Sequence, residues 1–198
     1  MEDSKVDIII EAARKRFAHY GLSKTTMTEI GTDIGMSKAA LYYYFADKER
    51  LFIAVIKKDI GEFESAVKEL LGKPTKASHK LKRYVAVRSE FFHKLLNLAK
   101  LENANLGELV NPMYNELKLT LLEREKVMVH NILEGGIKSR EFVRFPLDEY
   151  VDVFVVGMVG LRTSGFTFNL ISGAEAEFQL NDKAVIFTDI FLKAIRRT

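Results

Sequence analysis

The chain contains no cysteine, and this absence excludes two kinds of structure. Without thiols it can build neither a disulfide framework nor a thiolate metal site. This composition fits a reducing compartment, and we expect the protein to be cytoplasmic. Tryptophan is also absent, and proline occurs only at positions 74, 112 and 146. So few helix breakers leave room for long helices.

Signals for secretion and membrane insertion are also missing. The first residues, MEDSKVD, are acidic and polar, unlike a secretory signal. The longest apolar stretch, residues 151–171, contains Asp152, Arg162, Asn169 and three glycines. A buried helix explains this stretch better than a membrane span does. We therefore predict no membrane partner.

The sequence has little excess of either charge. Its net charge is +3, and its first fifty residues contain eight basic and eight acidic side chains. Bulk charge alone therefore makes no case for nucleic acid, and any such case depends on where individual charges lie.

The apolar residues are spaced as in helices almost throughout, which predicts an all-α fold. We expect a compact unit of three short helices, a long connecting helix, and a larger helical bundle. The predicted helices run from Ser4 to Gly21, from Thr26 to Gly35, from Ser37 to Phe45, and from Asp47 to Leu71, then over 77–102, 113–138, 147–171 and 181–197, with a short helix possible at 105–111.

Polar residues and glycines mark the ends of the first four helices. Ser4, Thr26, Ser37 and Asp47 are the predicted N-caps, and Thr26 forms a capping box with Glu29. Gly21 is expected to end the first helix in a left-handed conformation, and Gly72 and Pro74 to end the fourth.

The second and third predicted helices, separated by Gly35, form a helix-turn-helix pattern. Gly31 is the small residue that lets the two helices cross closely. The segments IIEAARKRFAHYG and TTMTEIGTDIGMSKAALYYYFADKERLF surround this pattern. Over about residues 8–56 they resemble the N-terminal domain of the TetR family of bacterial transcriptional regulators. Gly31 and Ala39 depart from that family's commoner alanine and glycine at these positions.

The resemblance implies three functional parts. They are an N-terminal helix-turn-helix DNA-binding domain at 1–47, a connecting helix at 48–74, and a C-terminal helical ligand-binding and dimerisation bundle at 75–198. It also implies a homodimer that represses transcription from an inverted-repeat operator. A small effector would shift the bundle, move the connecting helix and so change the separation of the two recognition helices.

The stretch LYYYF of the third helix places its aromatic rings in different directions. At 100° per residue, Leu41, Tyr44 and Phe45 share the core side, while Tyr42 and Tyr43 point outward or sideways. A tyrosine hydroxyl can donate to a phosphate, and small alanines permit close approach to a groove. With the resemblance, the predicted DNA-binding residues are Thr26, Thr28, Ser37, Lys38, Ala39, Ala40, Tyr42, Tyr43, Tyr44 and Lys48. The basic run at positions 14–16 is interpreted as a solvated helix face.

The C-terminal helices are rich in apolar and aromatic residues, so we expect a hydrophobic effector. Aromatic and polar side chains on these helices are candidates to line its site, although core packing explains any single aromatic better than ligand contact does. The predicted ligand-binding residues are Phe91, Phe92, His93, Asn97, Tyr114, His130, Phe154, Met158 and Arg162. No spacing indicates a metal, and we predict no cofactor.

Three other functions remain open at the level of sequence. An enzyme is disfavoured, because the chain has no Gly-rich phosphate loop, no H-E-x-x-H, no G-x-S-x-G and no cysteine nucleophile. A helical interaction module without DNA binding is disfavoured by the Ser37-Lys38, Tyr42-Tyr43 and Lys48 set. An activator of the same fold would carry the same DNA-binding residues as a repressor.

Overall fold

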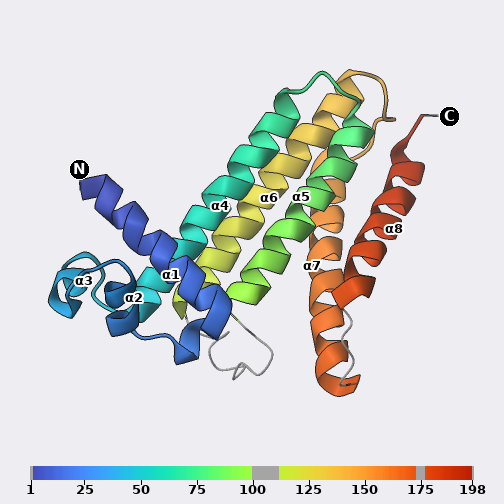
Figure 1. Cartoon of the computed structure of the whole chain (residues 1–198). Helices are drawn as coiled ribbons and strands as arrows, with labels where there is room; N and C mark the ends of the chain where they lie inside the picture. Colours follow the sequence, from blue (N-terminus) through green and yellow to red (C-terminus); the bar gives the residue numbers. More distant parts are fainter. Residues whose placement is uncertain (1, 100–111, 173–176, 198) are drawn as a thin grey trace. The chain divides into compact units, whose positions relative to one another are not determined.

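The computed structural model describes residues 2–99, 112–172 and 177–197, with side chains for 4–95, 115–162 and 183–197. The described chain is almost entirely helical (Figure 1), which confirms the predicted all-α fold. Its helices are α1 (Glu2–Lys24), α2 (Met27–Asp33), α3 (Lys38–Tyr44), α4 (Lys48–Gly72), α5 (Ala77–Ala99), α6 (Pro112–Lys138), α7 (Leu147–Ser172) and α8 (Glu177–Ile195). None of the helices in the described part of the chain combines the length and the apolar character of a membrane span.

The first helix differs from its prediction at the start. Helix α1 begins at Glu2, so Ser4 lies inside the helix and its assignment as N-cap is wrong. Acidic side chains at positions 2 and 3 favour this earlier start, because the positive end of the helix dipole attracts them. Gly21 interrupts the helix with the predicted positive φ, 79°, although its ψ of 166° lies outside the left-handed helical region.

The other helix ends lie close to their predicted positions. Asp47 caps α4 as expected, because its carboxylate accepts a hydrogen bond from Arg50 N at 2.6 Å. Helix α4 then continues to Gly72. The possible helix at 105–111 lies outside the described residues. Local capping chemistry was therefore sufficient to place most ends within a few residues.

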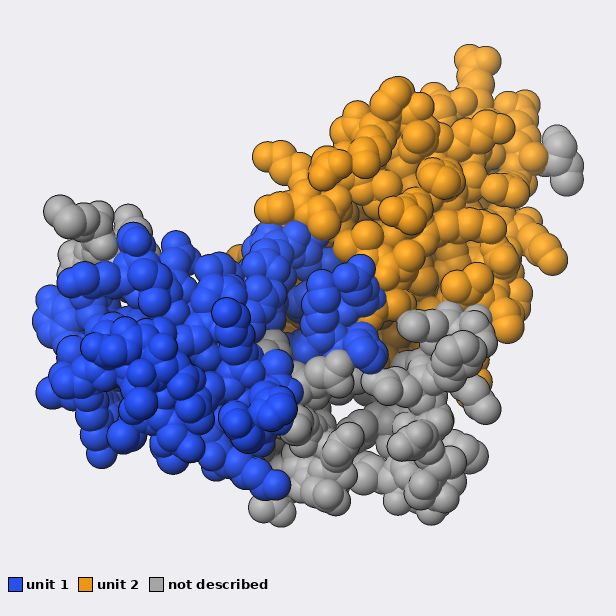
Figure 2. All heavy atoms as spheres, viewed as in Figure 1, with its two compact units in different colours: residues 1–64, 90–116 blue, residues 65–89, 117–198 orange. Residues whose placement is uncertain are grey.

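The chain divides into two compact units, coloured separately in Figure 2. Unit 1 comprises residues 1–64 and 90–116, and unit 2 comprises 65–89 and 117–198. Helices α4, α5 and α6 each contribute residues to both units. In unit 1 the fully buried side chains come from the first four helices: Ile9, Ala13, Phe17, Ile30, Leu41, Leu51 and Val55. In unit 2 they come from α5 to α8, and include Leu81, Leu133, Phe154 and Ile195.

Ion pairs join α1 to α4 within unit 1. The Arg14 guanidinium donates to both carboxylate oxygens of Glu62, at 3.2 and 2.9 Å, and pairs with the buried carboxylate of Asp59. Among the described residues, neither Asp59 oxygen accepts a hydrogen bond. Burial raises the pKa of Asp59 to about 6, although the charge of Arg14 opposes this shift. Asp59 therefore carries a charge in a place that disfavours it.

The substitution Asp59→Asn is expected to stabilise the protein at pH 7.5, by about 1–3 kcal/mol. The pKa of Asp59 is raised on folding, so the protonated carboxyl is the form that the folded protein favours. Its contribution to the free energy of unfolding is fully present near pH 4 and is lost as the pH rises through about 6. Urea unfolding followed by circular dichroism between pH 4.5 and 8 measures this difference. The gain should shrink towards the acidic end.

The exposed Glu62 provides a control of opposite sign. Its pKa is lowered by the hydrogen bond from Arg14, so Glu62→Gln should weaken the fold slightly at pH 7.5. If Asp59→Asn also destabilises the protein at pH 7.5, the attraction of Arg14 outweighs the cost of burying this carboxylate.

Candidate functional site

Helices α2 and α3 form a helix-turn-helix, and Gly31 of α2 lies close to the backbone of the turn between them. Met36 N donates to Gly31 O at 2.8 Å, and Ile34 N donates to the same oxygen at 3.2 Å. A Cβ added to Gly31 would lie 2.7 Å from Met36 O, which is too close for any side chain without a backbone shift. Gly35 has a φ of +66°, a conformation that glycine adopts at little cost. Gly35 therefore has its predicted role in the turn, whereas the close contact of Gly31 is with Met36 in the turn rather than with α3.

Helix α3 buries one side and presents tyrosines on the other. Leu41 is fully buried, whereas 42% of Tyr42 and 76% of Tyr43 are exposed. Tyr44 is half-buried, and its ring meets the edge of Tyr43 at a centroid distance of 5.1 Å. Helix α3 ends at Tyr44, and Phe45 after it has an extended backbone with φ −134° and ψ 113°. The outward directions predicted for Tyr42 and Tyr43 are therefore confirmed.

The first turn of α3 adds a positive charge to the same surface. The Ser37 hydroxyl oxygen caps the helix by accepting from Ala40 N at 3.1 Å. The Lys38 ammonium lies 5.8 Å from the centroid of the Tyr42 ring, a cation–π arrangement. Ala39 is exposed and Ala40 half-buried, so little bulk covers the backbone between these longer side chains. The exposed side of α3 thus combines hydroxyl donors, an ammonium and small residues.

Thr26 forms the predicted capping box with Glu29. Its hydroxyl oxygen accepts from Glu29 N at 3.3 Å, while its backbone N–H donates to the Glu29 carboxylate at 2.9 Å. The Thr26 hydroxyl also donates to that carboxylate, at 2.7 Å. Because its proton is already engaged, a phosphate would have to compete with Glu29 for this donor. Thr28 is exposed one turn into α2.

Sequence reasoning missed the roles of Arg14 and Arg16, whose run of basic residues it interpreted as solvated. Arg16 forms a two-pronged ion pair with Asp33, with distances of 2.5 and 2.8 Å, and lies 3.4 Å from Glu29. The hydrogen bond from Arg16 lowers the pKa of Asp33. This pair joins α1 to α2 and balances the acidic side chains beside the helix-turn-helix. No local pattern reveals it, because seventeen positions separate the partners.

Lys48 is the first residue of α4, where free backbone N–H groups and the helix dipole favour an anion. Its ammonium donates to Ser23 O at 3.4 Å, so the side chain lies beside the last turn of α1. It is half-exposed and belongs to the same unit as α2 and α3.

Comparison with known proteins decides the family. The model of the bacterial regulatory proteins of the tetR family matches residues 9–55, which include the starts of α2, α3 and α4. A transcriptional regulator from Cytophaga hutchinsonii, known from its crystal structure, is 38% identical; the match covers 98% of this chain and 99% of that one, with a TM-score of 0.90. The chain belongs to the TetR family of bacterial transcriptional regulators.

Curated relatives of this TetR-family protein are also regulators. An HTH-type transcriptional repressor of Mycobacterium tuberculosis is 41% identical over 51 residues, which span 26% of this chain and only 27% of the repressor's length. The fatty acid metabolism regulator of Bacillus subtilis is 25% identical over 162 residues, covering 75% of this chain and 82% of that regulator. Of these two curated relatives, the one with the higher identity matches only a segment of about helix-turn-helix size.

The predicted effector residues of this TetR-family protein fall into both units. In unit 1, Phe91 and Phe92 are buried, Phe91 stacks on Phe63 at 4.9 Å, and His93 is exposed. In unit 2, Phe154 and Met158 are buried. The remaining members are the half-exposed His130, 3.7 Å from Asp148, the half-buried Arg162, and Asn97 and Tyr114, whose side chains lie outside the described residues.

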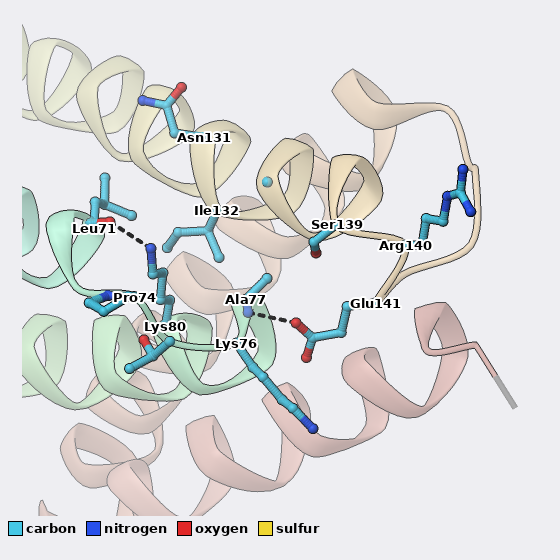
Figure 3. Close-up of a pocket in the computed structure, with 12 residues that line it drawn as sticks. Leu71, Pro74, Lys76, Ala77, Lys80, Asn131, Ile132, Ser139, Arg140 and Glu141 are labelled. Atoms are coloured by element: carbon cyan, nitrogen blue, oxygen red, sulfur yellow. Dashed lines mark hydrogen bonds between the residues drawn. The ribbon is translucent and has the colours of Figure 1, made fainter.

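A pocket of about 590 Å³ with a mixed polar and apolar lining lies in unit 2, and none of the predicted effector residues lines it. Figure 3 shows it between the α4–α5 turn and the end of α6. The Glu141 carboxylate caps α5 by accepting from Ala77 N at 2.6 Å and Ser78 N at 3.1 Å. Lys80 donates to Leu71 O at 2.6 Å. These hydrogen bonds hold the segment after α6 against the start of α5, and α5 against the end of α4. The polar side chains that line the pocket therefore have a role in the fold.

Proposed function

We propose that this TetR-family regulator binds an inverted-repeat operator as a homodimer and represses transcription until a small hydrophobic effector releases it. The observation that carries the proposal is the exposed side of α3, where Tyr42, Tyr43 and Lys38 surround small alanines above a buried Leu41. A recognition helix needs such a division, because one side must hold the fold while the other enters the major groove.

The proposed contacts divide into phosphate and groove contacts. Tyr42 and Tyr43 donate their hydroxyls to phosphates, and Lys48 pairs with a phosphate at the start of α4. Lys38 meets a phosphate or a base edge, and the methyl groups of Ala39 and Ala40 permit close contact with the groove floor. Supporting contacts come from Thr26, Thr28, Ser37 and Tyr44. Most of these contacts are to charged phosphates, which are the same at every base pair. Binding should therefore weaken strongly as the salt concentration increases.

An apolar surface on α7 and α8 supports the homodimer. The two helices pack against each other within unit 2 (Figure 1). Val153 and Val156 on α7 and Ile186 and Ile190 on α8 are each 57–62% exposed. Large aliphatic side chains exposed together on adjacent helices are typical of a protein interface. A second copy of the chain would bury this α7–α8 surface in an isologous contact.

The proposed effector acts through the part of the chain at 75–198, with 48–74 as the connection to the DNA-binding part at 1–47. Helix α4 supports this coupling, because its continuous run from Lys48 to Gly72 belongs to both units. The name of the Bacillus subtilis relative, a fatty acid metabolism regulator, supports a hydrophobic effector class. A regulator of this kind would work in the cytoplasm, where its DNA is.

Gel-shift titration with DNA flanking the protein's own gene tests the proposal. Tyr42→Phe should weaken binding roughly 3–10-fold, because one charge-assisted hydrogen bond per subunit is lost. Lys48→Ala should weaken binding on all sequences and reduce the salt slope by about 1 per subunit.

Lys57→Ala, an exposed lysine further along α4, is the matched control and should leave both quantities nearly unchanged. Unchanged affinity in both Tyr42→Phe and Lys48→Ala would contradict the assignment of this surface. Salt-insensitive or absent DNA binding would favour an interaction module instead.

A further inference from the structure

The two acidic side chains of α2 share one arginine of α1. The Arg16 Nε atom donates to Asp33 Oδ2 at 2.5 Å, and its Nη2 atom donates to Asp33 Oδ1 at 2.8 Å. The Nη1 atom of the same guanidinium lies 3.4 Å from Glu29 Oε1. Tyr20, one turn further along α1, adds a cation–π contact, with its ring centroid 5.6 Å from the guanidinium carbon. Groups on two helices therefore hold Arg16 in one position.

Both carboxylates of α2 carry their charge on an open surface. The hydrogen bond from Arg16 lowers the pKa of Asp33, and hydrogen bonds from Thr26, followed by the charge of Arg16, lower the pKa of Glu29. The side chains of Glu29 and Asp33 are 46% and 38% exposed, so an approaching molecule meets them. With Arg16 these three side chains have a net charge of about −1, and without it the carboxylates alone would have about −2.

Helix α2 is the part of the helix-turn-helix where negative charge is least welcome. The first helix of this motif crosses the DNA backbone, so its charged side chains come close to phosphates. Glu29 lies next to one of the proposed phosphate contacts, because its carboxylate accepts from the Thr26 hydroxyl at 2.7 Å. Like charges repel each other over several ångströms, and exposed charges do so most strongly at low salt. A cation beside these carboxylates would therefore assist DNA binding.

We propose that Arg16 is a positioning residue for DNA binding, which compensates the charges of Asp33 and Glu29 so that α2 can lie against the phosphates. This inference rests on the proposed DNA-binding function and adds to it a residue that acts through two others. A purely structural role, in which Arg16 only joins α1 to α2, leads to a different expectation. Removing either partner of the Arg16–Asp33 pair would then weaken DNA binding, whereas charge compensation predicts opposite effects for the two partners.

Gel-shift titrations of four variants at about 50 mM salt test this proposal, on the DNA that flanks the protein's own gene. Arg16→Gln should weaken binding roughly 3–10-fold, and Asp33→Asn should strengthen it by a similar factor. The Arg16→Gln/Asp33→Asn double variant should bind within about twofold of the wild type, because its net charge is the same. Arg16→Lys keeps the charge without the two-pronged geometry, so it should retain most of the affinity.

Two controls separate the charge of Arg16 from other effects. Lys15→Gln removes a positive charge from the neighbouring exposed position of α1 and should change the affinity less than about twofold. At about 300 mM salt the differences among the Arg16 and Asp33 variants should shrink towards twofold or less, because salt screens exposed charges. Circular dichroism melting shows which variants are folded, and Asp33→Asn tests the proposal even if Arg16→Gln does not fold.

The inference is overturned if Asp33→Asn weakens binding, if the double variant stays as weak as Arg16→Gln, or if the loss in Arg16→Gln is the same at both salt concentrations. Tyr42→Phe and Lys48→Ala, measured in the same titrations, keep the two proposals apart. If they weaken binding while the Arg16 and Asp33 variants behave like the wild type, only the role of Arg16 is contradicted. If the wild-type protein does not bind DNA, both proposals are contradicted.

Discussion

The double substitution Val156→Asp/Ile190→Asp is expected to convert the proposed dimer into monomers and to reduce operator affinity more than 100-fold. The exposed α7–α8 surface would place four aspartates in a dimer interface, and each charge would lose water without gaining a partner. A monomer also keeps only one of two recognition helices, so the contacts to one half-site are lost. Light scattering after size exclusion should give a mass near 22.6 kDa for the variant and twice that for the wild type.

Val127→Asp provides the matched control for this experiment. Val127 is a valine on α6 with an exposure of 61%, close to that of Val156, but it lies outside the α7–α8 surface. We expect it to remain dimeric and to bind DNA normally. A dimeric double variant, or a monomeric Val127→Asp variant, would place the interface elsewhere.

The second large effect is expected from Gly31→Ala. The new Cβ would lie 2.7 Å from Met36 O, a backbone atom, so the turn between α2 and α3 would have to move. Overpacking of this kind costs about 1–3 kcal/mol, and the displaced α3 should lose at least tenfold in operator affinity. The resemblance to the TetR family implies that alanine is common at this position, so the expectation for this chain rests on the contact between Gly31 and Met36 O.

Gly61→Ala also replaces a glycine by alanine, but we expect it to stabilise the protein rather than to destabilise it. Gly61 lies inside α4 with open space around its Cα, so alanine should stabilise the protein by about 1 kcal/mol through helix propensity. Urea unfolding and gel shifts of the two variants, measured side by side, separate a steric effect from a general effect of replacing glycine. Equal behaviour of the two variants would show that the close approach at Gly31 is not restrictive.

Features controlled by neighbouring residues were predictable from the sequence. The capping box at Thr26, the caps at Ser37 and Asp47, and the directions of Tyr42 and Tyr43 all depend on spacings of four residues or fewer. The helical period converts such spacings directly into geometry. The prediction of Ser4 as an N-cap was wrong because the position of a cap also depends on the residues that precede it. The acidic residues at positions 2 and 3 favour an earlier start of the helix.

Features controlled by distant partners were not predictable. Arg14 meets Glu62 across 48 positions, and Arg88 meets Glu125 across 37. Composition cannot tell such buried ion pairs from solvated charges, because it carries no information on which helices become neighbours. The aromatic effector candidates show a related ambiguity. Phe91 and Phe154 have the same apolar pattern whether they fill a core or line a pocket, and in the structure both pack against other rings.

Footprinting on the DNA that flanks the protein's own gene tests the central claim most directly. We expect two protected half-sites related by a two-fold axis, with centres about one helical turn apart or a multiple of it. Protection should weaken steeply between about 50 and 200 mM salt and should be lost in a Tyr42→Phe/Lys48→Ala double variant. Unaltered protection by that double variant, or no protection at low salt, would contradict the account of α3 as the DNA-reading helix.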